Sequence, residues 1–254
     1  MTQAAVNTVA IVQARMGSTR LPGKVLMDLA GQTVLARVLR RLGRARRIDA
    51  IVVATTTAGA DEAIVPECSR LGVPCFRGSE EDVLDRYYQA ASNSAATAVV
   101  RITADCPLVE PAIVDQTIQT FLERHAEYAS NSLPRTYPRG LDVEVFTASA
   151  LEQAQREAAL HHQREHVTPY FYEHPELFRL ASHRGLQDYS AFRWTVDTAE
   201  DLQMIRAIYD CFNGRDDFHW LEAVALLEEQ PEVARLNAHV IQKRCAQAEA
   251  VLLP

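Results

Sequence analysis

Cysteine, long apolar runs and net positive charge are all scarce in this chain. The five cysteines among 254 residues are scattered, with no CxxC pair and no Cys/His spacing of a metal site. This usage argues against a disulfide framework and a structural zinc, and it favours a reducing compartment. No stretch reaches the roughly 18 apolar residues of a membrane span, and no basic region precedes the first apolar one. We therefore expect a cytoplasmic protein without a membrane partner.

The charge balance is acidic. Thirty-three Asp and Glu against 26 Lys and Arg give a net charge of −7, so the chain lacks the global basic field that holds duplex nucleic acid. We expect no nucleic-acid partner, and any polyanion must be bound locally. With 48% hydrophobic residues the chain has enough apolar side chains for one main core. A single domain over residues 7–246 is the expectation.

Strand-like and helix-like segments alternate through the first half. Short runs rich in valine and isoleucine ("TVAIVQA", "IDAIVVATT", "VPCF", "TAVVRIT") are each followed by a segment of helical period ("TVLARVLRRL", "ADEAIVPECSRL", "EEDVLDRYYQAA", "PAIVDQTIQTFLER"). Four such units in a row predict an α/β fold with a parallel sheet covered by helices.

The regularity weakens in the second half. After the turn-rich "LPRTYPRG", "LDVEVFTA" predicts a strand and "LEQAQREAALHHQREHVTPYFYEH" one or two helices. We expect residues 132–175 to form an excursion or small lobe. The chain then returns with "FRWTVDT", a predicted strand, followed by the helix "AEDLQMIRAIYDCF" and a polar helical tail.

The loop after the first strand, "ARMGSTRLPGK", concentrates phosphate-binding chemistry. In parallel sheets ligands bind beyond the carboxyl ends of the strands. Gly17 and Gly23 allow close backbone approach, while Arg15, Arg20 and Lys24 supply three cations. A Walker A loop does not fit, because five residues separate Gly17 from Gly23 and Val25 follows the lysine; no GxGxxG is present either. The alternative is a solvated basic loop.

These residues resemble a known family. "ARMGSTRLPGK" is similar to the N-terminal signature of cytidylyltransferases that activate sugar acids, and "FRGSEEDVLDRY", "RITADCPLV", "YPRGLDVEVF", "REHVTPY" and "WTVDTAEDL" resemble its spore-coat polysaccharide branch. The resemblance implies a Rossmann-like, GT-A-like nucleotidyltransferase with a mixed, mainly parallel sheet. It also implies attack of a sugar hydroxyl on the α-phosphorus of CTP with release of pyrophosphate. The nucleotide-binding residues expected in this loop are Ala14, Arg15, Gly17, Ser18, Thr19, Arg20 and Lys24.

Two aspartates follow predicted strands and are candidates for binding Mg²⁺. Asp105 lies in "RITADCP" and Asp197 in "WTVDTAEDL", and the resemblance matches both to the family's metal-binding aspartates. Such a transfer needs a metal held by a few carboxylates. For Asp197 the alternative is a helix N-cap. Together with Lys24 and Arg15, Asp105 is predicted to be catalytic. Ala104 and Cys106 depart from the sugar-acid branch, which leaves the identity of the sugar open.

The base and acceptor sites are predicted from later segments. The resemblance puts the base at Arg77, Gly78 and Ser79, although Ser79 also fits a helix cap. Arg139 is the candidate for a substrate carboxylate, because a guanidinium binds planar anions bidentately. Asp142 and Glu144 are two residues apart on a predicted strand and share a face. They fit a contact to the acceptor or a second metal, the manganese site of a glycosyltransferase, or an ordinary edge strand.

His162 and His166 are four residues apart on one helical face. We interpret their segment as a lid or dimer element in which His166 contacts the acceptor, with a solvated helix as the alternative.

The leading hypothesis is a Mg²⁺-dependent, homodimeric cytidylyltransferase that makes a CMP-activated sugar or sugar acid for surface polysaccharide. The rivals are a nucleotide-sugar glycosyltransferase and a nucleotide-binding module without activity.

Overall fold

The computed structural model describes residues 6–242, so residues 243–246 of the predicted domain and Cys245 lie outside the described residues. Its centre is a seven-stranded sheet in the order β5-β4-β1-β6-β8-β7-β9. The strand bounds are β1 Thr8–Gln13, β4 Ala50–Thr56, β5 Cys75–Gly78, β6 Ala98–Thr103, β7 Tyr128–Ser130, β8 Glu144–Thr147 and β9 Leu180–Ser182. A separate hairpin joins β2 (Asp28–Leu29) to β3 (Gln32–Thr33).

The sheet is mixed but mainly parallel, as predicted. Within it only β8 runs antiparallel to its neighbours, β6 and β7. The pairs β1–β4, β4–β5, β1–β6 and β7–β9 are all parallel. The carboxyl ends of β1, β4, β5 and β6 therefore meet at one edge of the sheet, where the predicted site residues of the first half lie.

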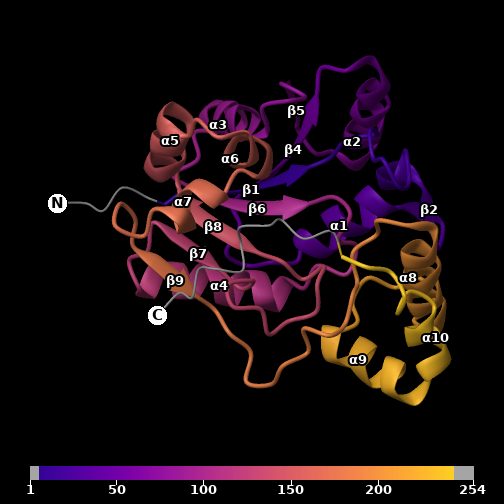
Figure 1. Cartoon of the computed structure of the whole chain (residues 1–254). Coiled ribbons are helices and arrows are strands. Elements are labelled where there is room, and N and C mark those ends of the chain that lie inside the picture. The colour runs from indigo at the N-terminus through magenta and orange to yellow at the C-terminus, as the bar shows by residue number, and fades with distance from the viewer. Residues whose placement is uncertain (1–5, 243–254) are drawn as a thin grey trace.

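Helices cover both faces, as Figure 1 shows. The side chains of Val9 and Ile11 in β1 pack in the core with α3 (Val83–Asn93), α5 (Ala148–Glu157) and α7 (Pro169–Glu173). Those of Ala10 and Val12 pack on the other side with α1 (Val34–Leu42) and α4 (Pro111–Glu123). Burial of both faces explains the unbroken apolar run of this strand.

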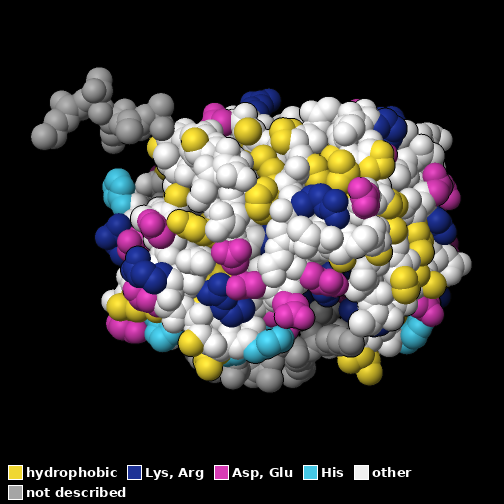
Figure 2. Space-filling view, turned by 90° about the horizontal axis from the view of Figure 1, so that it is seen from above, with side chains coloured by type: hydrophobic (Ala, Val, Ile, Leu, Met, Phe, Trp, Pro, Cys, Tyr) yellow, Lys and Arg dark blue, Asp and Glu magenta, His cyan; other side chains and the backbone are white. Residues whose placement is uncertain are grey.

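The remaining helices complete the layers. They are α2 (Ile64–Leu71), α6 (His161–His166) and the group of α8 (Ala199–Cys211), α9 (Trp220–Glu229) and α10 (Pro231–Arg235), with 3-10 helices η1 (Lys24–Leu26) and η2 (Gly59–Ala63). In Figure 1 the last three α-helices lie together at one end of the molecule. No helix among the described residues is long and apolar enough to span a membrane. Figure 2 shows acidic and basic side chains interspersed over the face seen from above.

The second half departs from the prediction in three ways. The predicted strand over 192–198 is wrong, because this segment makes only an isolated bridge between Arg193 and Arg139. The short strands β7 and β9 were not predicted. The predicted one or two helices over 151–174 are three, α5 to α7. The strand predicted in "LDVEVFTA" is confirmed as β8, which belongs to the main sheet.

Candidate active site

The loop after β1 is closed on itself by one carbonyl group. The oxygen of Met16 accepts the backbone N–H groups of both Ser18 and Gly23 at 2.9 Å. The backbone N–H of Met16 donates to Asp61 Oδ1 at 2.6 Å, and this bond connects the loop to the segment after β4. Gly23 has φ 73°, a left-handed conformation that favours glycine, and it turns the chain into η1.

Several hydrogen-bond donors of this loop have no acceptor in the part of the chain that the structure describes. The backbone N–H groups of Gly17, Thr19 and Arg20 have no acceptor among residues 6–242, and neither does the exposed guanidinium of Arg15. Ser18 Oγ accepts the N–H of Leu21 at 3.4 Å. Unpaired amides beside arginines form the kind of concavity that binds phosphate oxygens.

Lys24, Asp105 and Asp197 form one cluster, hereafter the lysine–aspartate cluster. The Lys24 ammonium contacts Asp105 Oδ2 at 2.7 Å and Asp197 Oδ1 at 2.8 Å. Only 7% of this lysine is exposed. Arg20 Nη2 lies 2.9 Å from Asp197 Oδ2. The structure thus joins three segments that are far apart in the sequence.

Backbone contacts hold the two aspartates side by side. Asp105 follows β6, and its carbonyl oxygen accepts the N–H of Val196 at 2.8 Å. The N-cap of α8 is Thr198, which forms a capping box with Asp201. The alternative in which Asp197 caps this helix is therefore wrong, and its carboxylate is turned toward Lys24 and Arg20 instead.

Neighbouring charges keep Lys24 and Asp197 ionised. Burial alone would lower the pKa of Lys24, but the two aspartates outweigh it and the net shift is upward. Burial would likewise raise the pKa of Asp197, whereas Lys24, Arg193 and Arg20 lower it to about 2. At neutral pH Asp197 is therefore a carboxylate and Lys24 a charged ammonium.

The cluster fits a divalent cation. Carboxylate oxygens are the donors that Mg²⁺ prefers, and it usually takes one or two of them along with substrate phosphates. A group of three or more acidic, Cys or His side chains able to hold a metal is absent from the described residues. The Lys24 ammonium already places a positive charge between the two carboxylates. Asp105 and Asp197 would hold the metal, with the phosphates completing its oxygen ligands.

The predicted base residues lie at the end of β5 and directly after it, beside the segment that follows β4. Arg77 donates through Nε to the Thr56 carbonyl at 3.0 Å and through Nη2 to the Ala58 carbonyl at 3.2 Å, so its guanidinium supports the chain between β4 and η2. A Cβ on Gly78 would lie 2.8 Å from Phe76 Cε1, which explains the glycine. Ser79 Oγ accepts the N–H of Asp82, and Asp82 caps α3.

Arg139 is fixed through its backbone and free at its guanidinium. Its N–H donates to Phe192 O at 3.0 Å, and its carbonyl accepts the N–H of Trp194 at 2.6 Å. A Cβ at Gly140 would lie 2.6 Å from Trp194 C, and φ there is 108°, so only glycine fits. Among the described residues the Arg139 side chain has no ion pair; burial and then nearby Arg135 lower its pKa.

The other predicted acceptor residues are divided between separate contacts. Asp142 precedes β8 and pairs with Arg135, whereas Glu144 in β8 pairs with Arg101 and accepts from the Tyr128 hydroxyl at 2.7 Å. The shared face predicted for Asp142 and Glu144 therefore does not produce a shared metal site in the described chain.

His166 ends α6 and is half-buried. Burial lowers its pKa, and Arg101 acts in the same direction. His162, four residues earlier, contacts Glu173 Oε1 at 2.8 Å, so this part of the helix is packed rather than solvated.

Sequence reasoning missed several polar residues around the site. Arg193 contacts Asp197 Oδ2 at 2.7 Å, and its spacing four residues before Asp197 was the available signal. Beneath the loop, Gln13 Oε1 and two nitrogens of the fully buried Arg86 have no hydrogen-bond partner among residues 6–242. No simple pattern in the sequence marks these two.

An α/β sheet that carries unpaired loop amides and a lysine–aspartate cluster at its carboxyl edge fits a nucleotidyltransferase. The chain belongs to the cytidylyltransferase family, whose model matches residues 9–244.

Two curated relatives and one solved structure each match most of the chain. It is 38% identical to an uncharacterized protein of Methanocaldococcus jannaschii over 95% of this chain and 98% of that one. It is 35% identical to the spore coat polysaccharide biosynthesis protein SpsF of Bacillus subtilis over 88% and 95%. A cytidylyltransferase structure from Leptospira borgpetersenii superposes with a TM-score of 0.87 at 33% identity, covering 91% of this chain and 97% of that one. The chain therefore has the family's fold and its CTP-dependent transfer of CMP.

Proposed function

We propose that the protein transfers CMP from CTP to a sugar or sugar acid, with Mg²⁺, for the synthesis of a surface polysaccharide. The observation that carries the proposal is the lysine–aspartate cluster, in which Lys24 bridges Asp105 and Asp197 beside a loop with free amides. Similarity to a spore coat polysaccharide protein supports the biosynthetic role. In the reaction a bond forms between the acceptor hydroxyl oxygen and the α-phosphorus, and the bond from that phosphorus to pyrophosphate breaks.

The loop binds the triphosphate. Arg15, Arg20 and Lys24 face its negative charge, and the N–H groups of Gly17 and Thr19 donate to phosphate oxygens. When bound at Asp105 and Asp197, a divalent cation supplies positive charge that offsets the charge building on the phosphates and the leaving group. The residues Arg77 to Ser79 lie near the base, with Ala14 and Ser18 along the nucleotide.

The acceptor site is built around Arg139. A sugar acid brings a carboxylate close to a triphosphate, so a further cation outside the loop is needed. Arg139 is suited to this because its backbone is fixed while its guanidinium lacks an ion pair in the described chain. Asp142, Glu144 and His166 border the acceptor in this proposal. Residues 132–175 also contribute to a homodimer, which sedimentation measurements would test, and the enzyme acts in the cytoplasm.

A pyrophosphate-release screen tests the reaction. The protein is incubated with each nucleoside triphosphate, Mg²⁺ and a set of sugar acids and neutral sugars. Release of pyrophosphate with CTP and a sugar acid supports the proposal. Release of a free nucleotide from a CMP-sugar, without pyrophosphate formation from CTP, would identify a glycosyltransferase instead. CTP binding without turnover on any acceptor would favour the inactive binding module.

A further inference from the structure

Arg193 lies in the extended segment before α8, beside the lysine–aspartate cluster. Its guanidinium holds two carboxylates at once. Nε and Nη2 contact Asp201 Oδ1 and Oδ2 at 2.9 and 3.0 Å, and Nη2 also donates to Asp197 Oδ2 at 2.7 Å. Because the guanidinium is planar and rigid, it fixes the position of Asp197 relative to Asp201.

The Asp201 carboxylate that Arg193 contacts is itself held by several hydrogen bonds. Its side chain is fully buried, and its Oδ2 accepts the backbone N–H groups of Asp197 at 3.0 Å and Thr198 at 3.1 Å. These bonds fasten the carboxylate to the first turn of α8. Because its guanidinium contacts both carboxylates, Arg193 holds the Asp197 carboxylate at a fixed position relative to Asp201.

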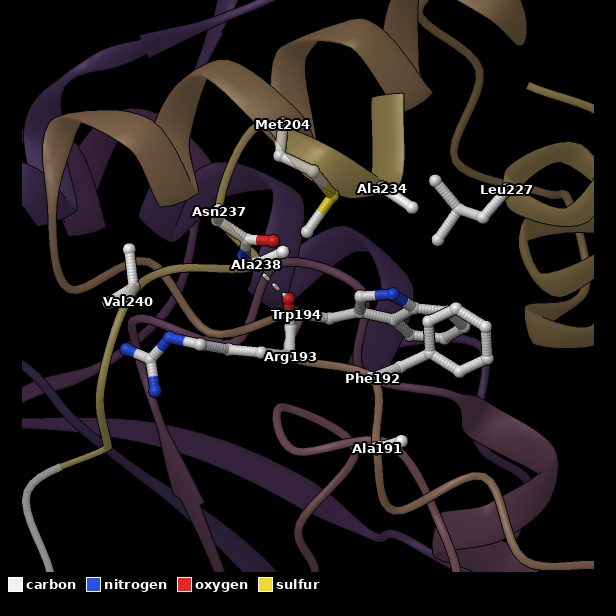
Figure 3. Close-up of a pocket in the computed structure, with 10 residues that line it drawn as sticks. All are labelled: Ala191, Phe192, Arg193, Trp194, Met204, Leu227, Ala234, Asn237, Ala238 and Val240. Carbon is white, nitrogen blue, oxygen red and sulfur yellow. Dashed lines mark hydrogen bonds between the residues drawn. The ribbon is translucent and has the colours of Figure 1, made fainter. Parts of the chain in front are cut away.

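The segment over residues 236–242 completes the support. Asn237, 5% exposed, donates through Nδ2 to Arg193 O and to Asp201 Oδ1, both at 2.9 Å. Arg193 Nη1 donates to Gln242 Oε1. Figure 3 shows the Arg193 side chain pointing away from Trp194 and toward the 236–242 segment, while its carbonyl faces Asn237. Asn237 thus contacts both residues that hold Asp197, Arg193 through its backbone carbonyl and Asp201 through its carboxylate.

The two oxygens of Asp197 have different partners. Oδ1 contacts Lys24, whereas Oδ2 is shared by Arg20 and Arg193. In the proposed function Lys24 and Arg20 bind the phosphates, so Arg193 is the cation that remains on Oδ2. We propose that Arg193 is a positioning residue that keeps Asp197 Oδ1 turned toward the metal, and that Asp201 and Asn237 hold Arg193 for this task. The inference rests on the proposed function, because it assigns Asp197 to the metal.

Mn²⁺ binding tests the inference without turnover. Free Mn²⁺ is measured by its electron paramagnetic resonance signal in solutions of the full-length protein with CTP and no acceptor. The variants are Arg193→Lys, Arg193→Gln and Asn237→Ala. Arg206→Gln is the matched control, because Arg206 is an exposed arginine on α8 that, among residues 6–242, donates only to the Asp28 carbonyl. CTP affinity without metal is measured by calorimetry on each protein.

Loss of a group that orients a metal ligand lowers metal affinity about ten- to a hundredfold. We expect losses of this order for Arg193→Gln, a smaller loss for Arg193→Lys and a loss of a few-fold for Asn237→Ala. The Arg206→Gln protein should bind Mn²⁺ like the wild type, and metal-free CTP affinity should change little in all four. Wild-type Mn²⁺ affinity in both Arg193 variants, even with a lower melting temperature, would overturn the positioning role.

A further variant separates this inference from the proposed function. Asp197→Asn should lose most Mn²⁺ affinity. If it does while the Arg193 variants bind normally, only the positioning role fails. If Asp197→Asn itself binds Mn²⁺ like the wild type, the metal assignment fails and the inference fails with it.

Discussion

Replacing Lys24 with alanine should change CTP binding and metal binding in opposite directions. The ammonium contacts Asp105 at 2.7 Å and Asp197 at 2.8 Å, so without ligands it acts as a tethered cation between the carboxylates. In the proposed complex it contacts the outer phosphates instead. Lys24→Ala removes both interactions, the first of which competes with metal while the second favours CTP.

The magnitudes follow from the contacts. A hydrogen bond to a charged group contributes roughly 1.5–3 kcal/mol, or about ten- to a hundredfold in affinity. CTP affinity should therefore fall by about that factor, and CMP affinity much less, because CMP lacks the outer phosphates. In Lys24→Ala a metal ion no longer has to displace the ammonium from the carboxylates. Its affinity should therefore rise by about the same factor, which is the contribution of one such contact.

Calorimetry with CTP, with CMP and with Mn²⁺ alone measures all three affinities, and Lys24→Arg is the control that keeps the charge. Equal losses for CTP and CMP would place Lys24 away from the outer phosphates. Unchanged or weaker binding of Mn²⁺ alone to Lys24→Ala would show that the ammonium does not occupy the metal position.

Three further predictions concern the aspartates and the acceptor. Asp105→Asn should keep its fold by circular dichroism and lose most turnover, since the amide removes a hard anionic ligand; wild-type turnover with an unchanged metal requirement would refute the assignment. Arg139→Lys and then Arg139→Ala should raise the sugar KM in that order with little change in CTP KM; a neutral sugar as best acceptor would contradict the carboxylate role. The pKa of Asp197 is lowered to about 2 from an ordinary 3.8. Ionised Asp197 therefore stabilises the ligand-free fold by roughly 2 kcal/mol above about pH 4, and this stabilisation is lost as the pH falls through 2. Urea unfolding at pH 2 and pH 6 should then show a smaller pH effect for Asp197→Asn than for the wild type.

The first half of the fold could be predicted because its signals are local. The strands β1, β4, β5 and β6 are each a short apolar run followed by a helix of clear period, and the right-handedness of β-α units leaves few possible arrangements. The three-residue strands β7 and β9 carry no comparable signal, since they exist only through their pairing with each other and with β8.

The segment over 192–198 shows how a correct local pattern gave a wrong prediction. Phe192, Trp194 and Val196 alternate with polar residues as in a strand. However, the N–H of Trp194 donates to Arg139 O and that of Val196 to Asp105 O. The hydrogen bonds of this extended segment thus go to two different loops, so no ladder forms.

The site was only partly predictable for the same reason. The loop after β1 and the two aspartates lie in contiguous motifs, which a sequence displays directly. The contacts of Arg193 with Asp201 and Asn237 join the start of α8 to a segment beyond α10. Such a network depends on tertiary packing, and no spacing rule predicts it.

The Met16 carbonyl that closes the loop after β1 also affects the entropy of ligand binding. Since it accepts from both Ser18 and Gly23, the backbone between them is ordered during folding. Ordering a flexible segment at the moment of binding reduces affinity, by roughly 0.5–1.5 kcal/mol for each immobilised side chain. In the proposed complex with CTP the backbone donors are already in place, so the entropic penalty that remains falls on the arginine side chains and on the nucleotide itself.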